Sequence, residues 1–341
     1  YESRTFYSGL PSTTPAVQGE LFYGERAAVP AFSFLERQTR QISTMFRHEC
    51  AKAVEDKLKE KSEGLLKGGS SWSNIYTGGA SSDETHFCAA RLAPREFFQR
   101  RALLRGLTFP LLHFPSLVRI GVLLVLEFLI AFWDMCHGVF RGEKFFQELK
   151  FVFMRVFVCI ALREVATIGV KIDLARGLPI VHMNFLGYDE QAHRRGPSSA
   201  FAHWSLKGID RCIKNIYRAA QRSARRDYEV WVYSDHGQEA TRFFHRDGAD
   251  LEEVVRSLMP SFNSGGVTSQ SDPAGSAPGR PRRPSVNRER QRASACLSPI
   301  DERTAEEGFA LAAMGPVGHL YFFHPEAHAR RREFAERIVR E

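Results

Sequence analysis

The stretch IVHMNFLGYDEQAHRRGPSS, residues 180–199, decides which fold and which chemistry this chain is expected to have. A short apolar run, Pro179–Phe185, opens it and is typical of a buried parallel strand. The rest is polar, with Asp189 and His193 four residues apart. Two interpretations are open at this point: a strand that ends in metal ligands, or a polar loop that follows a core strand.

The residues that follow predict a strand, a helix and a strand. Ser199–Arg222 has apolar residues at helical spacing, and YEVWVYSDHG (228–237) is expected to form a second buried strand. This unit predicts an α/β fold with a mostly parallel central sheet flanked by helices. In open α/β sheets, ligands bind beyond the carboxyl ends of the strands, where both acidic-histidine clusters lie.

The two clusters together favour a metal site. Asp189 and His193 form one cluster, and Asp235 and His236 form the other. A single Asp-x-x-x-His is usually a solvated surface feature, but two carboxylates and two imidazoles suit divalent cations, zinc above all. Two ions about 4 Å apart would stabilise the attacking and leaving oxygens of a phosphoryl group.

A hydroxyl nucleophile for such a site is available near the start of the chain. SGLPSTTPAVQG (8–19) places Ser12, Thr13 and Thr14 at an expected helix start. The helix dipole and a metal ion would stabilise an alkoxide there. The alternative is that one of these side chains only caps the helix.

Composition excludes several classes of protein. The chain has 341 residues, 43% hydrophobic and 25% charged, which is an ordinary globular balance. Six arginines between residues 280 and 292 account for much of the net charge of +8, so no nucleic acid is expected as a partner. The six cysteines form no CxxC pair, which argues against a disulfide framework and a thiolate zinc site.

Two apolar stretches leave the relation to a membrane open. Ile120–Trp133 contains Glu127, and Phe151–Val170 contains Arg155 and two more charged residues. Neither meets the requirement of about 20 apolar residues for a spanning helix. They are either two packed helices or a hairpin that contacts a membrane surface. Membrane association is the expected localisation, and a soluble cytoplasmic chain is the alternative.

Four motifs in order carry a family resemblance: PSTTP, GGSSWSNIYTGGA, NFLGYDEQAHRRGPSS and VYSDHG. They resemble the alkaline phosphatase superfamily, and within it the type I phosphodiesterase/nucleotide pyrophosphatase branch. They look especially like bacterial membrane-associated members of that branch. The resemblance covers most of residues 6–245.

The resemblance implies catalytic and substrate-binding roles by position. Thr14, the fourth residue of Pro-x-x-Thr, matches the nucleophile, with Thr13 as the second choice. Asn74 would stabilise a phosphate oxygen, although its distance in sequence from Thr14 is long. Arg194 and Arg195 would bind a substrate phosphate, with ordinary surface arginines as the alternative.

The resemblance also implies the cofactors: two divalent metal ions, with zinc as the expected metal. Its ligand sets are Asp189 and His193 for one ion and Asp235 and His236 for the other, with the Thr14 hydroxyl deprotonated on one of the two ions. The reaction implied is hydrolysis of phosphodiester or pyrophosphate bonds through a covalent Thr14-phosphoryl intermediate. The substrate would be a small phosphate ester or a lipid-linked one.

Two departures from the family pattern limit this expectation. The family has a metal-binding Asp upstream of the nucleophile and a His-Gly pair after the second metal motif, and neither occurs here. His319 and His324 lie in a strand-like context instead. We therefore expect a truncated fragment that binds zinc poorly and is itself inactive.

Three other functions remain as alternatives: a phosphomonoesterase, a phospho-head-group transferase, and a non-catalytic membrane-associated relic. The region around PSTTP has no C/S-x-P-x-R motif, which argues against a sulfatase.

The expected organisation has five parts. Residues 1–84 hold the nucleophile, 85–172 are a helical insertion that caps the site or docks on a membrane, and 173–264 carry the metal motifs. Residues 265–298 form a disordered Pro/Arg-rich insertion, and 299–341 continue the α/β domain.

Three local elements are also expected from their patterns. Residues 41–66 have the spacing of a polar amphipathic helix, 67–82 have the composition of a Gly/Ser-rich loop, and 308–324 have a strand pattern. A helix is expected to follow the last of these.

Overall fold

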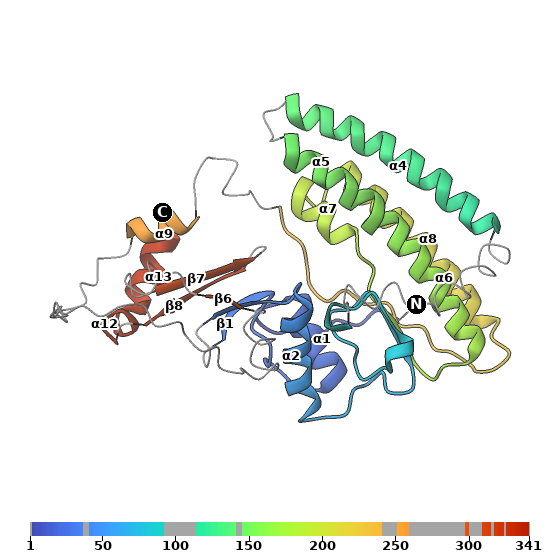
Figure 1. Ribbon diagram of the computed structural model, residues 1–341, viewed down its shortest axis with the longest axis horizontal. Helices are drawn as coiled ribbons and strands as arrows, with labels where there is room; N and C mark the ends of the chain where they lie inside the picture. The colour runs from blue at the N-terminus through green and yellow to red at the C-terminus, as the bar shows by residue number, and fades with distance from the viewer. Residues whose placement is uncertain are drawn as a thin grey trace, which may run out of the picture. The chain divides into compact units, whose positions relative to one another are not determined.

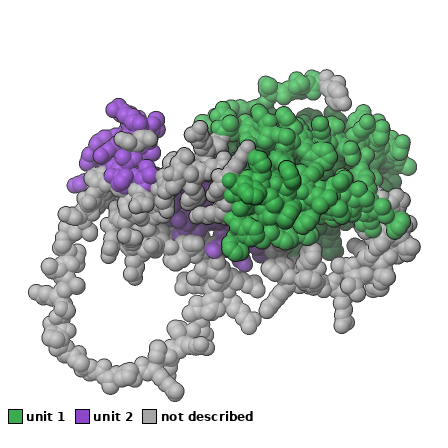
Figure 2. All heavy atoms as spheres, turned by 90° about the horizontal axis from the view of Figure 1, so that it is seen from above, with its two compact units in different colours: residues 1–31, 51–241 green, residues 32–50, 242–341 purple. Residues whose placement is uncertain are grey.

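The structure is a computed structural model (Figure 1) that describes residues 2–36, 41–91, 114–140, 145–240, 251–258, 297–299, 309–314, 317–323 and 325–340. Two compact units make up the chain (Figure 2). Unit 1 comprises residues 1–31 and 51–241, and unit 2 comprises residues 32–50 and 242–341.

A parallel three-stranded sheet lies at the centre of unit 1. Its strands are β4 (Thr85–His86), β3 (Ser70–Trp72) and β5 (Val181–Met183), in that order. Ser71 is in register with Thr85 on one side and with His182 on the other. The predicted α/β class, with a parallel sheet flanked by helices, is confirmed.

Side-chain alternation in β5 separates the two faces of this sheet. Val181 and Met183 pack on a core formed by Trp72 with helices α6 (Arg163–Arg176) and α8 (Ala200–Gln221). His182 points the other way and makes an edge contact with Phe22 of helix α1 (Thr14–Tyr23), with ring centroids 4.8 Å apart. The helix that begins at the predicted nucleophile therefore covers the face opposite α6 and α8.

Gly169 allows α6 to approach the sheet closely. A Cβ atom at this position would lie 1.9 Å from Cη2 of Trp72, a residue that also donates from Nε1 to Asp173 at 2.8 Å. The indole ring of Trp72 packs in the core and is bonded to Asp173, so it has little room to move away from an added Cβ atom at position 169.

We predict that Gly169→Ala destabilises the protein by about 2 kcal/mol or more, because overpacking a filled core forces side chains and backbone to shift. Gly121→Ala in helix α4 is the matched control, since a Cβ there meets nothing within 4 Å. Because alanine favours the helix more than glycine does, this control should raise the free energy of unfolding by up to about 1 kcal/mol. Urea unfolding of both variants measures the difference, and equal stability would contradict the packing argument.

The helical insertion consists of α4 (Phe114–Phe140), α5 (Phe145–Met154) and the π-helical segment η3 (Arg155–Leu162), which runs into α6. Helices α4 and α5 lie antiparallel, side by side (Figure 1), and pack through Ala131, Met135 and Val152. Among the described residues, no helix has both the length and the apolar character needed to cross a bilayer.

The remaining elements of unit 1 are short. Helix α2 (His48–Lys59) begins in unit 2 and continues into unit 1, and the 3-10 turns η1 (Ser82–Glu84) and η2 (Ala89–Arg91) flank β4. Glu55 of α2 is 1% exposed and accepts from the Tyr23 hydroxyl at 2.6 Å and from the backbone N–H of Thr77 at 2.8 Å. This carboxylate ties α2, the end of α1 and the loop after β3 together.

Unit 2 contains antiparallel pairs. The strands β1 (Ser33–Glu36), β2 (Gln41–Thr44) and β6 (Leu297–Pro299) form one sheet in that order, and β7 (Phe309–Met314) and β8 (Val317–Phe322) form a hairpin. Its helices are α9 (Leu251–Leu258), α12 (Pro325–Ala329) and α13 (Arg331–Arg340). The predicted strand pattern over 308–324 and the closing helix are confirmed.

The predicted helix over 41–66 is wrong in its first part, and the predicted 67–82 loop is wrong at its centre. Residues 41–44 form β2, because Ile42 is paired with Leu35 and Ser298 in the sheet. Residues 70–72 form β3, since parallel neighbours lie on both sides of it. In each case pairing with distant residues overrides the local pattern.

The predicted strand over 228–237 is wrong, so the βαβ unit lacks its second strand. The segment has no regular secondary structure, and Trp231 is 77% exposed. Tyr228 and Val230 still pack on the core around Trp72, and the Tyr233 hydroxyl lies 2.6 Å from His182 Nε2. Side-chain contacts, not ladder hydrogen bonds, hold this segment beside β5, which is half-buried and not fully buried as predicted.

The five-part division of the chain stays a prediction. Most of the predicted insertion 265–298 lies outside the described residues, as do residues 92–113 of the predicted helical part.

Candidate active site

Helix α7 (Tyr188–Arg195) carries the first predicted metal cluster. The helix begins after Gly187, whose φ of 119° suits only glycine, and the Glu190 carboxylate accepts the Gly187 N–H at 2.5 Å. The helix places Asp189 and His193 one turn apart on the same face. Asp189 Oδ1 and His193 Nε2 lie 3.2 Å apart.

The electrostatics of this pair favour a charged carboxylate. Burial acts to raise the pKa of Asp189, but the hydrogen bond with His193, the charges of His193 and His236 and a hydrogen bond from Gln238 together hold it below its ordinary value. The hydrogen bond to Asp189 raises the pKa of His193 against the effect of burial.

The structure brings the predicted nucleophile to the second cluster. Thr14 is the first residue of α1, 8% exposed, and its Oγ1 lies 3.5 Å from His236 Nε2. His236 Nδ1 lies 3.0 Å from the Gly237 carbonyl oxygen, an acceptor, so Nδ1 carries the proton. The lone pair of Nε2 is therefore directed at the Thr14 hydroxyl. These two residues are 222 positions apart in sequence.

The donor set fits divalent cations in chemistry and in spacing. Two ligands of one tetrahedral zinc, each at about 2.0–2.1 Å, lie roughly 3.3 Å apart. The Thr14–His236 distance of 3.5 Å and the Asp189–His193 distance of 3.2 Å are both close to that value. Asp235 Oδ1 lies 3.9 Å from His236 Nε2. The pairs are formed, although no three of Asp189, His193, Asp235 and His236 have ligand atoms that all lie within 4.8 Å of one another.

Asn74 lies close to the helix that carries Thr14. It is 2% exposed; its Oδ1 accepts from Gln18 Nε2 at 3.3 Å, and its Nδ2 donates to Ser71 Oγ at 2.8 Å. Gln18 is one turn after Thr14 in α1. The bonds with Gln18 and Ser71 fix the orientation of the Asn74 amide. Contact of Asn74 with a substrate oxygen stays a prediction.

Arg195 binds the helical insertion. Its Nη2 donates to Asp134 of α4 at 3.0 Å and to Glu148 of α5 at 2.8 Å, and its side chain is 13% exposed. The two carboxylates raise its pKa against the effect of burial. The side chain of Arg194 lies outside the described residues. Phosphate binding by these two arginines stays a prediction.

We predict that Arg195→Met lowers the free energy of unfolding by about 3 kcal/mol, because it removes a paired cation from two buried carboxylates, Asp134 and Glu148. Arg211→Met, at an exposed position of α8, is the control and should change stability by less than about 0.5 kcal/mol. Denaturant unfolding measures both. A raised KM for a phosphate ester at unchanged stability would instead support the substrate-binding role.

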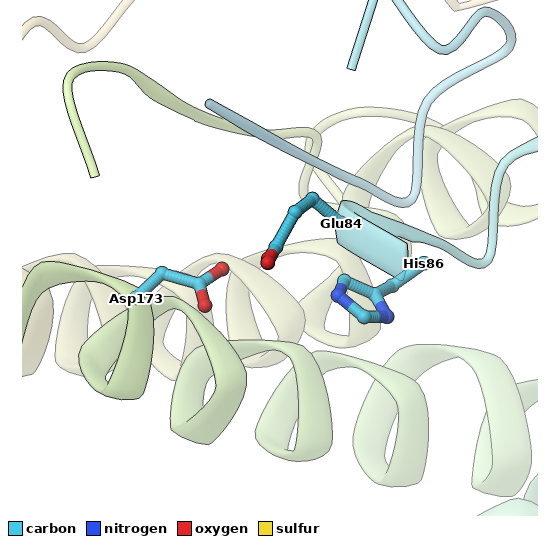
Figure 3. A group of neighbouring side chains, drawn as sticks. All are labelled: Glu84, His86 and Asp173. Atoms are coloured by element: carbon cyan, nitrogen blue, oxygen red, sulfur yellow. The ribbon is translucent and has the colours of Figure 1, made fainter. Parts of the chain in front are cut away.

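A third cluster lies on the α6 face of the sheet: Glu84, His86 and Asp173 (Figure 3). Their ligand atoms all lie within 4.8 Å of one another, which makes them the one such group of three or more in the described part of the chain. However, Arg176 Nη1 donates to Glu84 Oε2 at 2.8 Å and to Asp173 Oδ1 at 3.0 Å. The guanidinium already pairs with both carboxylates, so the cluster is explained as an ion-pair network.

Two glutamines at the site were missed by sequence reasoning. Gln238 Nε2 donates to Asp189 Oδ1 and lies 3.2 Å from His193 Nε2. Gln18 accepts the Ile75 N–H at 2.8 Å in addition to its bond with Asn74. No local pattern marks either residue; the only signal is that Gln18 follows Thr14 by one helical turn and Gln238 follows His236 by two residues.

Comparison with known proteins gives one match. Residues 179–310 match the family model described as type I phosphodiesterase / nucleotide pyrophosphatase. The matched segment includes Asp189, His193, Asp235 and His236, while Thr14 and Asn74 lie outside it. The comparisons with curated proteins and with solved structures found no match.

Proposed function

We infer, from the type I phosphodiesterase/nucleotide pyrophosphatase domain of the alkaline phosphatase superfamily at residues 179–310, that this chain hydrolyses phosphate esters. We propose further that the bonds cleaved are phosphodiester or pyrophosphate bonds. The proposed nucleophile is Thr14, and the proposed cofactors are two divalent cations, with zinc favoured.

The contact between Thr14 and His236 is the observation that supports this proposal most strongly. A hydroxyl at the start of α1 and an imidazole of the matched domain meet at 3.5 Å although they are 222 residues apart in sequence. A helix cap alone would not require a histidine partner. Thr14 makes no side-chain bond to its own helix of the kind that caps do, and the N-cap residue, Thr13, makes none either.

In the proposed site, Asp189 and His193 hold one cation, and Asp235, His236 and Thr14 hold the other. When bound, the cations lower the pKa of the attacking hydroxyl and neutralise charge on the phosphate. Thr14 Oγ forms a bond to phosphorus while the bond to the leaving oxygen breaks. Water then cleaves the Thr14–phosphate ester, which releases a phosphate monoester and restores the hydroxyl.

Hydrolysis of bis-p-nitrophenyl phosphate and of p-nitrophenyl phosphate, with and without a chelator, tests the proposal. We expect diester turnover that the chelator abolishes and added zinc restores. Preference for the monoester would identify a phosphatase instead, and turnover unaffected by chelation would contradict the metal site. If neither ester is cleaved while zinc is bound, the hydrolase proposal fails for simple esters, and a transferase becomes the better explanation.

A further inference from the structure

In the helical insertion formed by α4, α5 and η3, several charged side chains are buried and many apolar side chains are exposed. Four of its charged side chains, Glu127, Asp134, Glu148 and Arg155, are 3%, 9%, 1% and 1% exposed. Of the others that the structure describes, Arg119 pairs with Glu164 and Lys150 is exposed. Arg155 donates to Glu127 Oε1 from Nε at 2.9 Å and to Asp134 Oδ2 from Nη1 at 3.3 Å. All four buried charges are directed inward and paired, although α4 and α5 lie at the surface of unit 1.

The outward face of the insertion is apolar. In α4 it includes Val125 at 61%, Trp133 at 75% and Phe140 at 91% exposure, and in α5 and η3 it includes Phe146 at 81% and Phe157 at 60%. Its other members on α4 are at least 45% exposed: Phe114, Val118, Val122, Leu126, Phe128, Leu129 and Phe132. We call these residues the apolar face. A shallow groove lined by Val118, Gly121, Val122, Val125 and Leu126 lies within it.

This arrangement is unfavourable in water and favourable in a hydrocarbon environment. A water-facing helix normally presents its charges outward and buries its aromatic residues. In a bilayer, ionisable side chains turn inward and pair with one another. The 27 residues of α4 give the apolar face a length of about 40 Å. Because no described helix is suited to spanning, the geometry favours a helix that lies in the plane of the interface.

A basic stripe on α8 begins next to this face. Lys207, Arg211, Lys214, Arg218 and Arg222 recur at three- and four-residue intervals, and all are exposed. No described acidic side chain forms an ion pair with them. Trp204 lies on the same side of α8, three residues before Lys207, and its Nε1 donates to Glu127 of α4 at 3.0 Å. This bond links α8 to α4, so the apolar face and the basic stripe belong to the same packed group of helices in unit 1.

We propose that the apolar face and the basic stripe together form a docking surface for an anionic lipid bilayer. The apolar side chains insert between the lipid chains, and the cations contact the anionic headgroups. Charge complementarity selects this partner over a second copy of the chain, because two copies would bring their basic stripes towards each other. A lipid-linked phosphate ester as substrate would rest in addition on the hydrolase function proposed above.

Flotation of the full chain with vesicles tests this surface without any need for catalysis. Vesicles of phosphatidylcholine alone are compared with vesicles that also contain phosphatidylglycerol. We expect the chain to float with the anionic vesicles, and Leu129→Glu with Trp133→Glu to reduce binding at least about tenfold. Leu65→Glu is the matched control, since this leucine is exposed but lies in the segment between α2 and β3 and is not part of the apolar face. Lys214→Glu with Arg218→Glu should remove the preference for anionic lipid.

The outcomes separate the possible occupants of the surface. Absence of flotation with either vesicle, or flotation unchanged by the α4 substitutions, would overturn the proposal. A dimer in solution that Leu129→Glu converts to a monomer would assign the face to a second copy instead. Diester hydrolysis measured on the same preparation without vesicles reports on the hydrolase proposal separately, so the failure of one is distinguishable from the failure of the other.

Discussion

Replacing Thr14 by alanine is expected to abolish phosphodiester hydrolysis, with a loss of at least about 10³-fold in turnover, because no other group supplies the nucleophile. The substitution removes the hydroxyl that lies 3.5 Å from His236 Nε2. Zinc bound by Asp189 and His193 should be retained, because neither residue bonds to Thr14.

Thr13→Ala is the matched control, since it removes the same group from the neighbouring position. The Thr13 hydroxyl is buried and has no hydrogen-bond partner among the described residues. It should keep most of the activity. Rapid-quench labelling with a radioactive diester would show the phosphorylated residue directly. If Thr13→Ala were the inactive variant and Thr14→Ala were active, Thr13 would be the nucleophile.

Replacing Asp189 or His193 by alanine is expected to lower the affinity for one metal ion by at least about 100-fold, since even the loss of a supporting residue costs 10- to 100-fold. Metal analysis of the dialysed protein should show one ion fewer per chain. The second ion, assigned to Asp235, His236 and Thr14, should remain. Both variants should also lose diester hydrolysis, because one ion alone neutralises only part of the phosphate charge.

Asp210→Asn and His203→Gln provide controls of the same residue types, at exposed positions of α8. They should change neither metal content nor activity. An unchanged metal content in Asp189→Ala would assign that ion elsewhere. Glu84→Gln then tests the cluster with His86 and Asp173, which in the structure is occupied by Arg176.

The elements that were predicted correctly from the sequence depend on interactions between residues that are close together in the chain. Ser199 caps α8, with Oγ accepting the Ala202 N–H at 3.2 Å, and the helix covers nearly the whole predicted range. The α/β class was predicted from a strand, this helix and a second strand, of which the first strand and the helix are present, and the apolar pattern over 308–324 indicated strand structure. Two acidic-histidine motifs were identified by residue type and spacing, which depend on no distant contact.

The pairing of residues that are distant in sequence depends on the packing of the whole chain and could not be predicted from local patterns. Ser70–Trp72 has a loop composition, yet it is the central strand because β4 and β5 donate and accept hydrogen bonds on both sides of it. Residues 228–237 have a strand composition, yet they form no strand. The inward orientation of Glu127 likewise depends on Arg155, 28 residues away.

The same distinction between local pattern and distant contact applies to the candidate site. Residue type and motif spacing were enough to identify the side chains capable of metal and phosphate chemistry: Thr14, Asp189, His193, Asp235 and His236. The tertiary structure decided that Thr14 meets His236 and that Arg195 binds carboxylates of the insertion. The physical reason is that local patterns determine backbone period and amphipathicity, whereas contacts between segments depend on how the whole chain packs and compensates its buried charges.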